Sequence, residues 1–110
     1  MDVSVVVNKV MHGREALGIF TSPEKAQKFM DRCAGKPGYV CHLERSFIRG
    51  YYQAPRHVFA AHTYDVHNDV HVLEGIYSDL SQAQKAVGRY GQIIEFAIDS
   101  PEDKLIFMNE

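Results

Sequence analysis

The chain contains no tryptophan, two cysteines and four prolines among its 110 residues. Two cysteines are too few for the disulfide framework of a small secreted domain, and the spacing of Cys33 and Cys41 matches no zinc knuckle. Both lie in segments that we expect to be buried, where a free cysteine behaves as a small apolar side chain. The alternative is redox or metal chemistry, which needs an accessible thiolate. We therefore predict structural cysteines and a reducing, cytoplasmic setting.

Long apolar runs and an excess of one charge are also missing. The longest such run, VSVVV at residues 3–7, is far shorter than the about 20 residues of a membrane-spanning helix. The start of the chain does not read as a secretory signal. Twelve basic residues stand against 14 acidic ones, a formal net charge of −2. No overall positive field is therefore available to attract nucleic acid or an anionic membrane.

Two stretches of the chain resemble each other, LGIFTSPEKAQKFM at 17–30 and EGIYSDLSQAQKAV at 74–87. Each has Gly-Ile, an aromatic residue, and the triplet AQK at the same spacing. This pattern predicts an internal duplication. We expect one pseudo-symmetric domain over residues 1–110, which divides into the following parts: repeat 1 at about 3–48, a connector at 49–57, repeat 2 at about 58–98, and a tail at 99–110.

Each repeat is predicted to form two strands, a helix and a third strand. The helices begin at the N-cap residues Ser22 and Asp79, and each carries one apolar stripe. The strands are expected at 3–10, 15–20 and 39–47, and again at 57–66, 70–77 and 93–98. The predicted fold class is α+β, an internal duplication of ββαβ with a mainly antiparallel sheet and two helices on one face. The tail is expected to add a short helix.

The alternation of side chains predicts that one face of this sheet is free of helices. Ile94 and Phe96 are expected to face a helix. The opposite, open face is expected to carry a mixture of apolar and polar side chains, namely Ser4, Val6, Val40, His42, Glu44, Ile93, Glu95 and Ala97. Such a face remains solvated or pairs with a second copy or a partner.

The arrangement resembles a group of small, mostly uncharacterised bacterial and phage domains of the hairpin–helix–strand kind. The resemblance rests on the turn that leads into each helix, at residues 18–26 and 75–83. It carries no catalytic residue. It implies the fold, and it implies the setting of a phage or bacterial accessory protein.

Four histidines lie within fifteen residues, and Asp65 and Asp69 lie among them. The four are His57, His62, His67 and His71. Histidine and aspartate are suitable ligands for zinc or nickel, so a metal site is one interpretation. However, HND at 67–69 reads as the tip of a hairpin, which separates His67 from His62, and His62 aligns with the inward Val7 of repeat 1. We therefore predict a hairpin without a metal, and keep this set as the alternative.

The connector region gathers arginine and tyrosine. Arginine and tyrosine are enriched at binding hot spots and also stack on single-stranded nucleic acid. The predicted partner-binding residues are Arg45, Arg49, Tyr51, Tyr52 and Arg56. The alternative is that the tyrosines pack over the edge of the sheet. A protein is the favoured partner, and nucleic acid is the least favoured because the chain as a whole is acidic.

Motifs of the common catalytic sites are missing. The sequence has no GxSxG, no Walker loop and no HExxH, and the neighbours Cys41 and His42 point to opposite sides of a strand. We therefore predict a non-enzymatic protein-binding module without a cofactor. An inhibitor encoded by a phage or mobile element, or a bacterial accessory factor, fits this reading, as does a homodimer. The alternative function is a metal- or small-ligand-binding sensor that uses the hairpin at 57–71.

Overall fold

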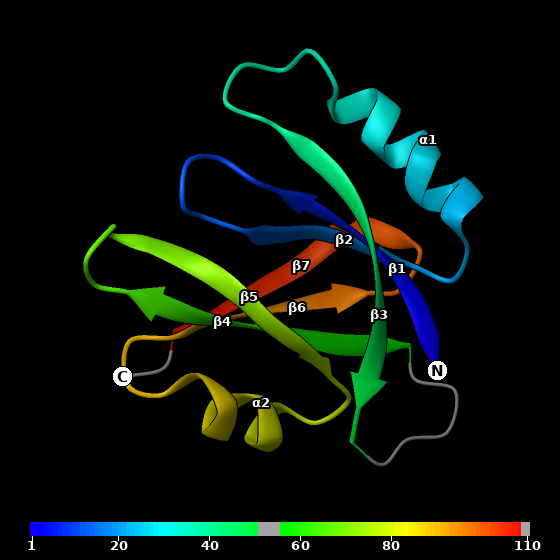
Figure 1. Ribbon diagram of the computed structural model, residues 1–110. Coiled ribbons are helices and arrows are strands. Elements are labelled where there is room, and N and C mark those ends of the chain that lie inside the picture. The colour runs from blue at the N-terminus through cyan, green and yellow to red at the C-terminus, as the bar shows by residue number, and fades with distance from the viewer. Residues whose placement is uncertain (51–55, 109–110) are drawn as a thin grey trace.

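The computed structural model describes residues 1–50 and 56–108, with the side chains of residues 1–50 and 56–100. Along the chain the elements are β1 (Asp2–Asn8), β2 (Glu15–Phe20), α1 (Pro23–Cys33), β3 (Cys41–Arg49), β4 (His57–Asp65), β5 (Val70–Tyr77), α2 (Leu80–Val87), β6 (Gln92–Ala97) and β7 (Ser100–Met108). Figure 1 shows their arrangement. Neither helix in this described part of the chain is long and apolar enough to cross a membrane.

The ends of the helices follow the local signals in the sequence. The hydroxyl of Ser22 accepts a hydrogen bond from the Lys25 amide, and Pro23 begins α1. The carboxylate of Asp79 caps α2 in the same way by accepting from the Ser81 amide. The tail differs from the prediction, because residues 100–108 form the strand β7 and pair with β6 instead of forming a helix.

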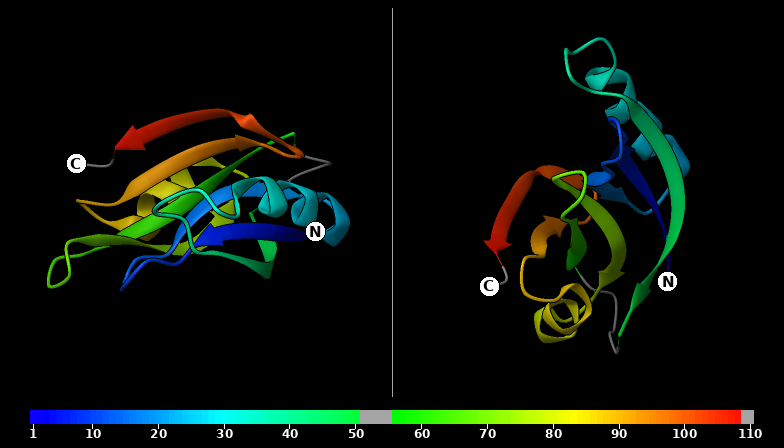
Figure 2. Two further views of the ribbon diagram at one scale, coloured as in Figure 1. Left: turned by 90° about the horizontal axis from the view of Figure 1, so that it is seen from above. Right: turned by 60° about the vertical axis from the view of Figure 1, so that its left-hand side comes forward.

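The strands form one seven-stranded sheet in the order β2-β1-β3-β5-β4-β6-β7. All neighbours pair antiparallel except β3 and β5, which pair in parallel through Ile48 with Ile76 and Arg49 with Tyr77. The sheet curls into a nearly closed barrel, as the two views in Figure 2 show. The α+β class is confirmed, but the arrangement predicted for it, a ββαβ duplication with a mainly antiparallel sheet and two helices on one face, is wrong, because the sheet is mixed and nearly closed. The prediction rested on the alternation of side chains along single strands. That alternation does not indicate how strongly a sheet curves or which distant strands pair in parallel.

The barrel is closed by the edge strand β2, which attaches to elements far along the chain. The Arg14 amide donates to the His71 carbonyl at 3.1 Å, and the Leu73 amide donates to the Arg14 carbonyl at 2.6 Å. At the other end of β2, the Asp99 amide donates to the Ile19 carbonyl at 2.9 Å. These bonds join β2 to β5 and to the turn between β6 and β7, so an edge that would otherwise face water is paired.

The core has an inner part and two outer parts. Inside the barrel lie the buried side chains of Val3, Val5, Val7, Ala16, Ile19, Ile48, Val58, Ala60, Leu73, Ile76, Ile94 and Phe96. Outside, α1 packs on a cluster that includes Val6 and Phe20, and α2 packs on one that includes Ala61 and Ile93. The predicted faces are therefore reversed: Val6 and Ile93 lie beneath helices, whereas Ile94 and Phe96 point into the barrel.

The guanidinium group of Arg14 holds β2, β3 and β5 together. It donates to Glu44 on β3 at 2.7 and 3.1 Å and to the Leu73 carbonyl on β5 at 2.9 Å. The hydrogen bonds from Arg14 lower the pKa of the Glu44 carboxyl below its usual value, and Lys9 adds to this effect. Both side chains are partly buried, so water screens the pair less than it screens an exposed ion pair.

Replacing Arg14 with methionine is expected to lower the free energy of unfolding by about 1.5–3 kcal/mol, the range for hydrogen bonds to charged groups. Urea denaturation monitored by circular dichroism measures this loss. Lys28→Met, which changes an exposed cation on α1, is the matched control and is expected to have little effect. Equal denaturation midpoints for the two variants would show that the Arg14 contacts do not hold the barrel closed.

Candidate functional site

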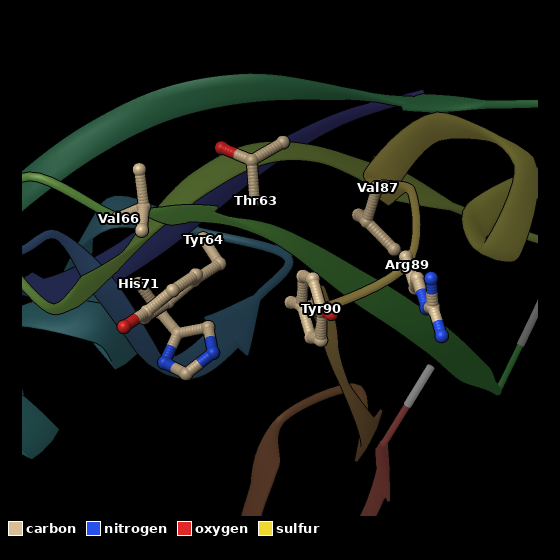
Figure 3. Close-up of a pocket in the computed structure, with 7 residues that line it drawn as sticks. All are labelled: Thr63, Tyr64, Val66, His71, Val87, Arg89 and Tyr90. Atoms are coloured by element: carbon tan, nitrogen blue, oxygen red, sulfur yellow. The ribbon is translucent and has the colours of Figure 1, made fainter. Parts of the chain in front are cut away.

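A groove lies beside the hairpin of β4 and β5, where the segment after α2 approaches it. We name it the aromatic groove, and its volume is about 850 Å³. It is lined by Thr63, Tyr64, Val66, His71, Val87, Arg89 and Tyr90. Figure 3 shows the rings of Tyr64 and His71 beside each other, with Tyr90 next to them and Arg89 beyond Tyr90. Aromatic and aliphatic walls with a few polar groups are typical of small-molecule sites.

The register of the hairpin places Tyr64 next to His71. The two residues are cross-strand partners in β4 and β5, and their ring centroids are 5.4 Å apart. The phenol of Tyr64 donates to Asp69 at 2.6 Å. This hydrogen bond raises the pKa of Tyr64, since ionisation would put a second negative charge beside the carboxylate. The ring of Tyr64 is therefore held from both sides before any ligand binds.

The tip of the hairpin is held by Asp65. Its carboxylate accepts from the amides of His67 and Asn68 at 3.1 and 3.3 Å and from the Asn68 side chain at 2.7 Å. These bonds, the one from the Asn68 side chain foremost, lower the pKa of Asp65. Asp69 adopts a positive φ of 53°, a conformation that aspartate tolerates better than most residues. The wall of the groove is thus a hydrogen-bonded turn.

The opposite wall comes from the segment that follows α2. Gly88 ends the helix with a φ of 71°, and the chain then presents Arg89 and Tyr90. The ring of Tyr90 is 64% exposed, and its centroid lies 6.4 Å from that of Tyr64 in an edge-on arrangement. The guanidinium carbon of Arg89 lies 5.6 Å from the centre of the Tyr90 ring. A large aromatic surface therefore remains open to solvent.

One ring nitrogen in the groove has an unsatisfied hydrogen bond. Nε2 of His71 is buried, and it has no hydrogen-bond partner among the residues that the structure describes. A buried polar atom without a partner costs about 1–3 kcal/mol. Native proteins keep few such atoms, and functional sites are one place where they keep them. His71, which lines the groove, therefore keeps a polar atom that none of the described residues uses.

The four histidines of the alternative metal set are distributed over different places. His57 begins β4 and is exposed, His67 lies at the exposed hairpin tip, and His71 lines the groove. His62 points into the barrel and is fully buried. Among the described side chains, those of residues 1–50 and 56–100, no three histidine, cysteine, aspartate or glutamate residues are grouped as a metal site requires.

His62 is a structural bridge across the barrel. Its Nε2 accepts a hydrogen bond from the Ala16 amide at 3.1 Å, which requires that atom to be unprotonated. Its Nδ1 lies 3.3 Å from the Gln92 carbonyl and donates to it in this tautomer. Burial, with smaller contributions from His71 and Arg14, lowers the pKa of His62 to about 4 against the opposing effect of hydrogen bonds with the backbone. The ring is therefore neutral at neutral pH.

Three of the predicted partner-binding residues, Arg45, Arg49 and Arg56, lie in the described part of the chain, and each has a different environment. Arg45 pairs with Asp2 at 3.0 Å, and Arg49 donates to Glu74 at 2.9 Å and to the Tyr77 hydroxyl at 3.2 Å. Arg56 is exposed before β4. Tyr51 and Tyr52 lie outside the described residues. The contacts of Arg49 stabilise the fold, because its guanidinium group also packs over Gly75 and the ring of Tyr77.

The outer side of β3 is the second exposed apolar surface. Phe47 is 65% exposed and Leu43 is 38% exposed, and Arg45 lies between them on the same side of the strand. Apolar side chains beside arginine are common at protein interfaces. Sequence alternation predicted that Leu43 and Phe47 share a face, but it did not predict that α1 leaves this part of the strand uncovered.

The two cysteines lie at the other end of β3. Cys33 is buried at the end of α1, and Cys41 packs against the cluster beneath that helix. Burial, followed by the neighbouring Cys33, raises the pKa of the Cys41 thiol. A raised pKa lowers the fraction of reactive thiolate, which favours the structural role predicted for these residues.

Sequence reasoning identified His71 but did not single out Tyr64, Arg89 or Tyr90. The spacing of Tyr90 from Ala83, Ala86 and Val87 favours a place on the apolar stripe of the second helix, whereas the helix ends at Val87. The segment GRYG at 88–91 carries the signal that was missed. Two glycines around an arginine and a tyrosine indicate a turn that presents both side chains.

No protein-family model matches the chain, and the comparisons with curated proteins and with solved structures found no match.

Proposed function

We propose that this protein binds a small molecule in the aromatic groove and does not act as an enzyme. The observation that carries the proposal is a groove walled by the rings of Tyr64, His71 and Tyr90, in which Nε2 of His71 has no hydrogen-bond partner among the described residues. This function corresponds to the small-ligand form of the sensor that the hairpin at 57–71 indicated. The proposal requires no metal and no cofactor, and it includes the cytoplasmic location that the sequence favours.

The preformed walls of the groove support this function. The bond from Tyr64 to Asp69 and the Asp65 turn hold one wall. The packing of Val87, the last residue of α2, against the barrel places the other. A site that is ordered before binding loses little conformational entropy when the ligand arrives. Catalysis would in addition need a nucleophile or a base with an oriented partner. The described side chains of the groove show no such pair.

The variant His71→Phe separates binding from stability. Phenylalanine keeps the ring beside Tyr64 but removes the buried nitrogen, so the free energy of unfolding is expected to stay the same or to rise. Affinity for ligands that contact Nε2 is expected to fall about tenfold, the effect of one lost hydrogen bond in a closed site. Urea denaturation measures the first quantity.

A fragment screen followed by NMR titration of the ¹⁵N-labelled protein measures the second. Binding fragments are expected to shift the amide signals of residues 63–66, 71 and 87–90. The control is Tyr39→Phe, which alters a tyrosine 43% exposed in the loop before β3. Loss of stability in His71→Phe, together with unchanged fragment affinity, would mean that His71 serves the fold and that the groove is not a binding site.

A second candidate function is protein binding through the outer side of β3. The exposed Phe47 and Leu43 with Arg45 favour it, and it retains the predicted protein-binding module, including an inhibitor of phage or mobile-element origin or a bacterial accessory factor. A homodimer through this surface is included. Light scattering after gel filtration measures the mass of the protein and of Phe47→Asp. If the variant Phe47→Asp still captures the same partner from a bacterial lysate, this surface is not the binding site.

A further inference from the structure

The charge of the aromatic groove indicates the charge of its ligand. Arg89 is exposed and forms no ion pair with any residue in the part of the chain that the structure describes. Its guanidinium group instead lies over the ring of Tyr90. An arginine in this position presents donors that match a carboxylate or phosphate in two parallel hydrogen bonds.

The two carboxylates near the groove are engaged in the hairpin wall. Asp65 accepts from the backbone and side chain of the hairpin tip, and Asp69 accepts from Tyr64. A cationic ligand on the Tyr90 ring would also lie close to the guanidinium group of Arg89, and like charges repel each other. Among the described residues of the groove, Arg89 is therefore the charged group that remains available to pair with a ligand, and its partner is an anion.

The rings of the groove indicate the shape of the ligand. Tyr64 and His71 lie beside each other, and Tyr90 meets Tyr64 edge-on, which leaves ring faces turned toward the groove. Stacking of a planar ring on one aromatic side chain contributes about 1–3 kcal/mol to binding. A saturated molecule of the same size covers these faces less completely, because its atoms do not lie in one plane.

We infer that the ligand is a planar aromatic anion. Its ring stacks on the exposed ring of Tyr90 and meets Tyr64 edge-on, and its anionic group pairs with Arg89. This inference rests on the proposed function, which it makes specific as to the class of ligand. The aromatic carboxylates are the simplest members of this class.

Four probes of matched size test the inference by isothermal titration calorimetry and NMR at neutral pH. They are 2-naphthoate, the neutral 2-naphthalenemethanol, the cationic 2-naphthylmethylamine, and decalin-2-carboxylate as the saturated anion. We expect 2-naphthoate to bind most tightly and to shift the signals of residues 63–66, 71 and 87–90. Its affinity is expected to exceed that of the neutral probe about tenfold, the effect of a hydrogen-bonded ion pair.

The variant Arg89→Met is expected to remove this tenfold preference and to leave the affinity for 2-naphthalenemethanol nearly unchanged. Lys85→Met removes the same charge from the exposed side of α2, and it is expected to keep the preference. Equal binding of the naphthoate and the alcohol, or a preference that survives Arg89→Met, would overturn the inference while the proposed function stands. Failure of all four probes to shift the groove signals would count against both.

Discussion

Replacing Phe96 with alanine is expected to lower the free energy of unfolding by about 3–5 kcal/mol, the range for emptying a buried aromatic site. The ring has no exposed surface and lies inside the barrel with residues of β1, β4 and β5. Its backbone pairs with Val58 on β4, so the surrounding strands are held in register and have little freedom to collapse into the space. Urea denaturation of both proteins measures the difference.

Phe47→Ala is the matched control for this experiment. It makes the same chemical change at a ring that is 65% exposed on the outer side of β3. The expected cost is within about 0.5 kcal/mol, as for surface substitutions in general. Similar costs for the two variants would show that the interior of the barrel is not the main core.

As the pH is lowered, protonation of His62 in the unfolded chain is expected to reduce the free energy of unfolding before the carboxylates of the protein become protonated. The pKa of His62 is about 4 in the folded protein, against about 6.5 for an unperturbed histidine. Between these values the unfolded chain binds a proton that the folded chain does not, so the free energy of unfolding falls as the pH is lowered. The full difference of about 2.5 pKa units corresponds to about 3 kcal/mol.

The window for this effect lies between about pH 6.5 and pH 4. Above it His62 is neutral in both states and contributes no pH dependence; below it both states are protonated. The pKa values of Glu44, Asp65 and Asp99 are lowered, so these carboxyl groups add a loss of stability at the acid end of the window and below it. The upper half of the window therefore reports mainly on His62.

The variant His62→Gln isolates this contribution. Glutamine keeps an acceptor for the Ala16 amide and a donor for the Gln92 carbonyl, but it does not titrate. Urea denaturation of both proteins at several pH values between 7 and 4.5 gives the comparison. The slope of stability against pH is expected to be smaller in the variant. Parallel curves for the two proteins would show that His62 is protonated in the folded state as readily as in the unfolded one.

The positions of the two helices and of β1 to β6 could be predicted because their signals are local, whereas the tail, which pairs with β6, was expected to be a helix. Ser22 and Pro23 mark the start of α1, Asp79 marks the start of α2, and each signal acts within a few residues. The hairpin of β4 and β5 is also a local feature, since its tip is bonded within residues 65–69. No long-range contact is needed for any of these assignments.

The curvature of the sheet depends on contacts between distant residues, and the prediction failed there. Val5, Val6 and Val7 are all fully buried, which means that both sides of β1 are covered. A continuous apolar run of this kind is the usual mark of a strand buried on both faces. A sheet with helices on one face only leaves the other face of β1 uncovered. In the structure the interior of the barrel covers that face, and this interior forms only when β2 meets β5.

The candidate site was predictable only in part for the same reason. His71 belongs to a conspicuous group of histidines, but that pattern indicated a metal and not an aromatic groove. Tyr90 follows His71 by nineteen residues, and only the packing of α2 on the barrel brings the two together. A small-molecule site built from separate segments leaves little trace in the spacing of its residues.

The attachments of β2 also determine when the chain can become stable during its synthesis. Outside its own hairpin, the backbone of residues 14–20 is hydrogen-bonded to His62, His71, Leu73 and Asp99. These four residues are made at least forty residues after β2. A nascent chain that has reached only Gly50 therefore pairs β2 with β1 alone, and the other edge of β2 is open to pairing with other chains.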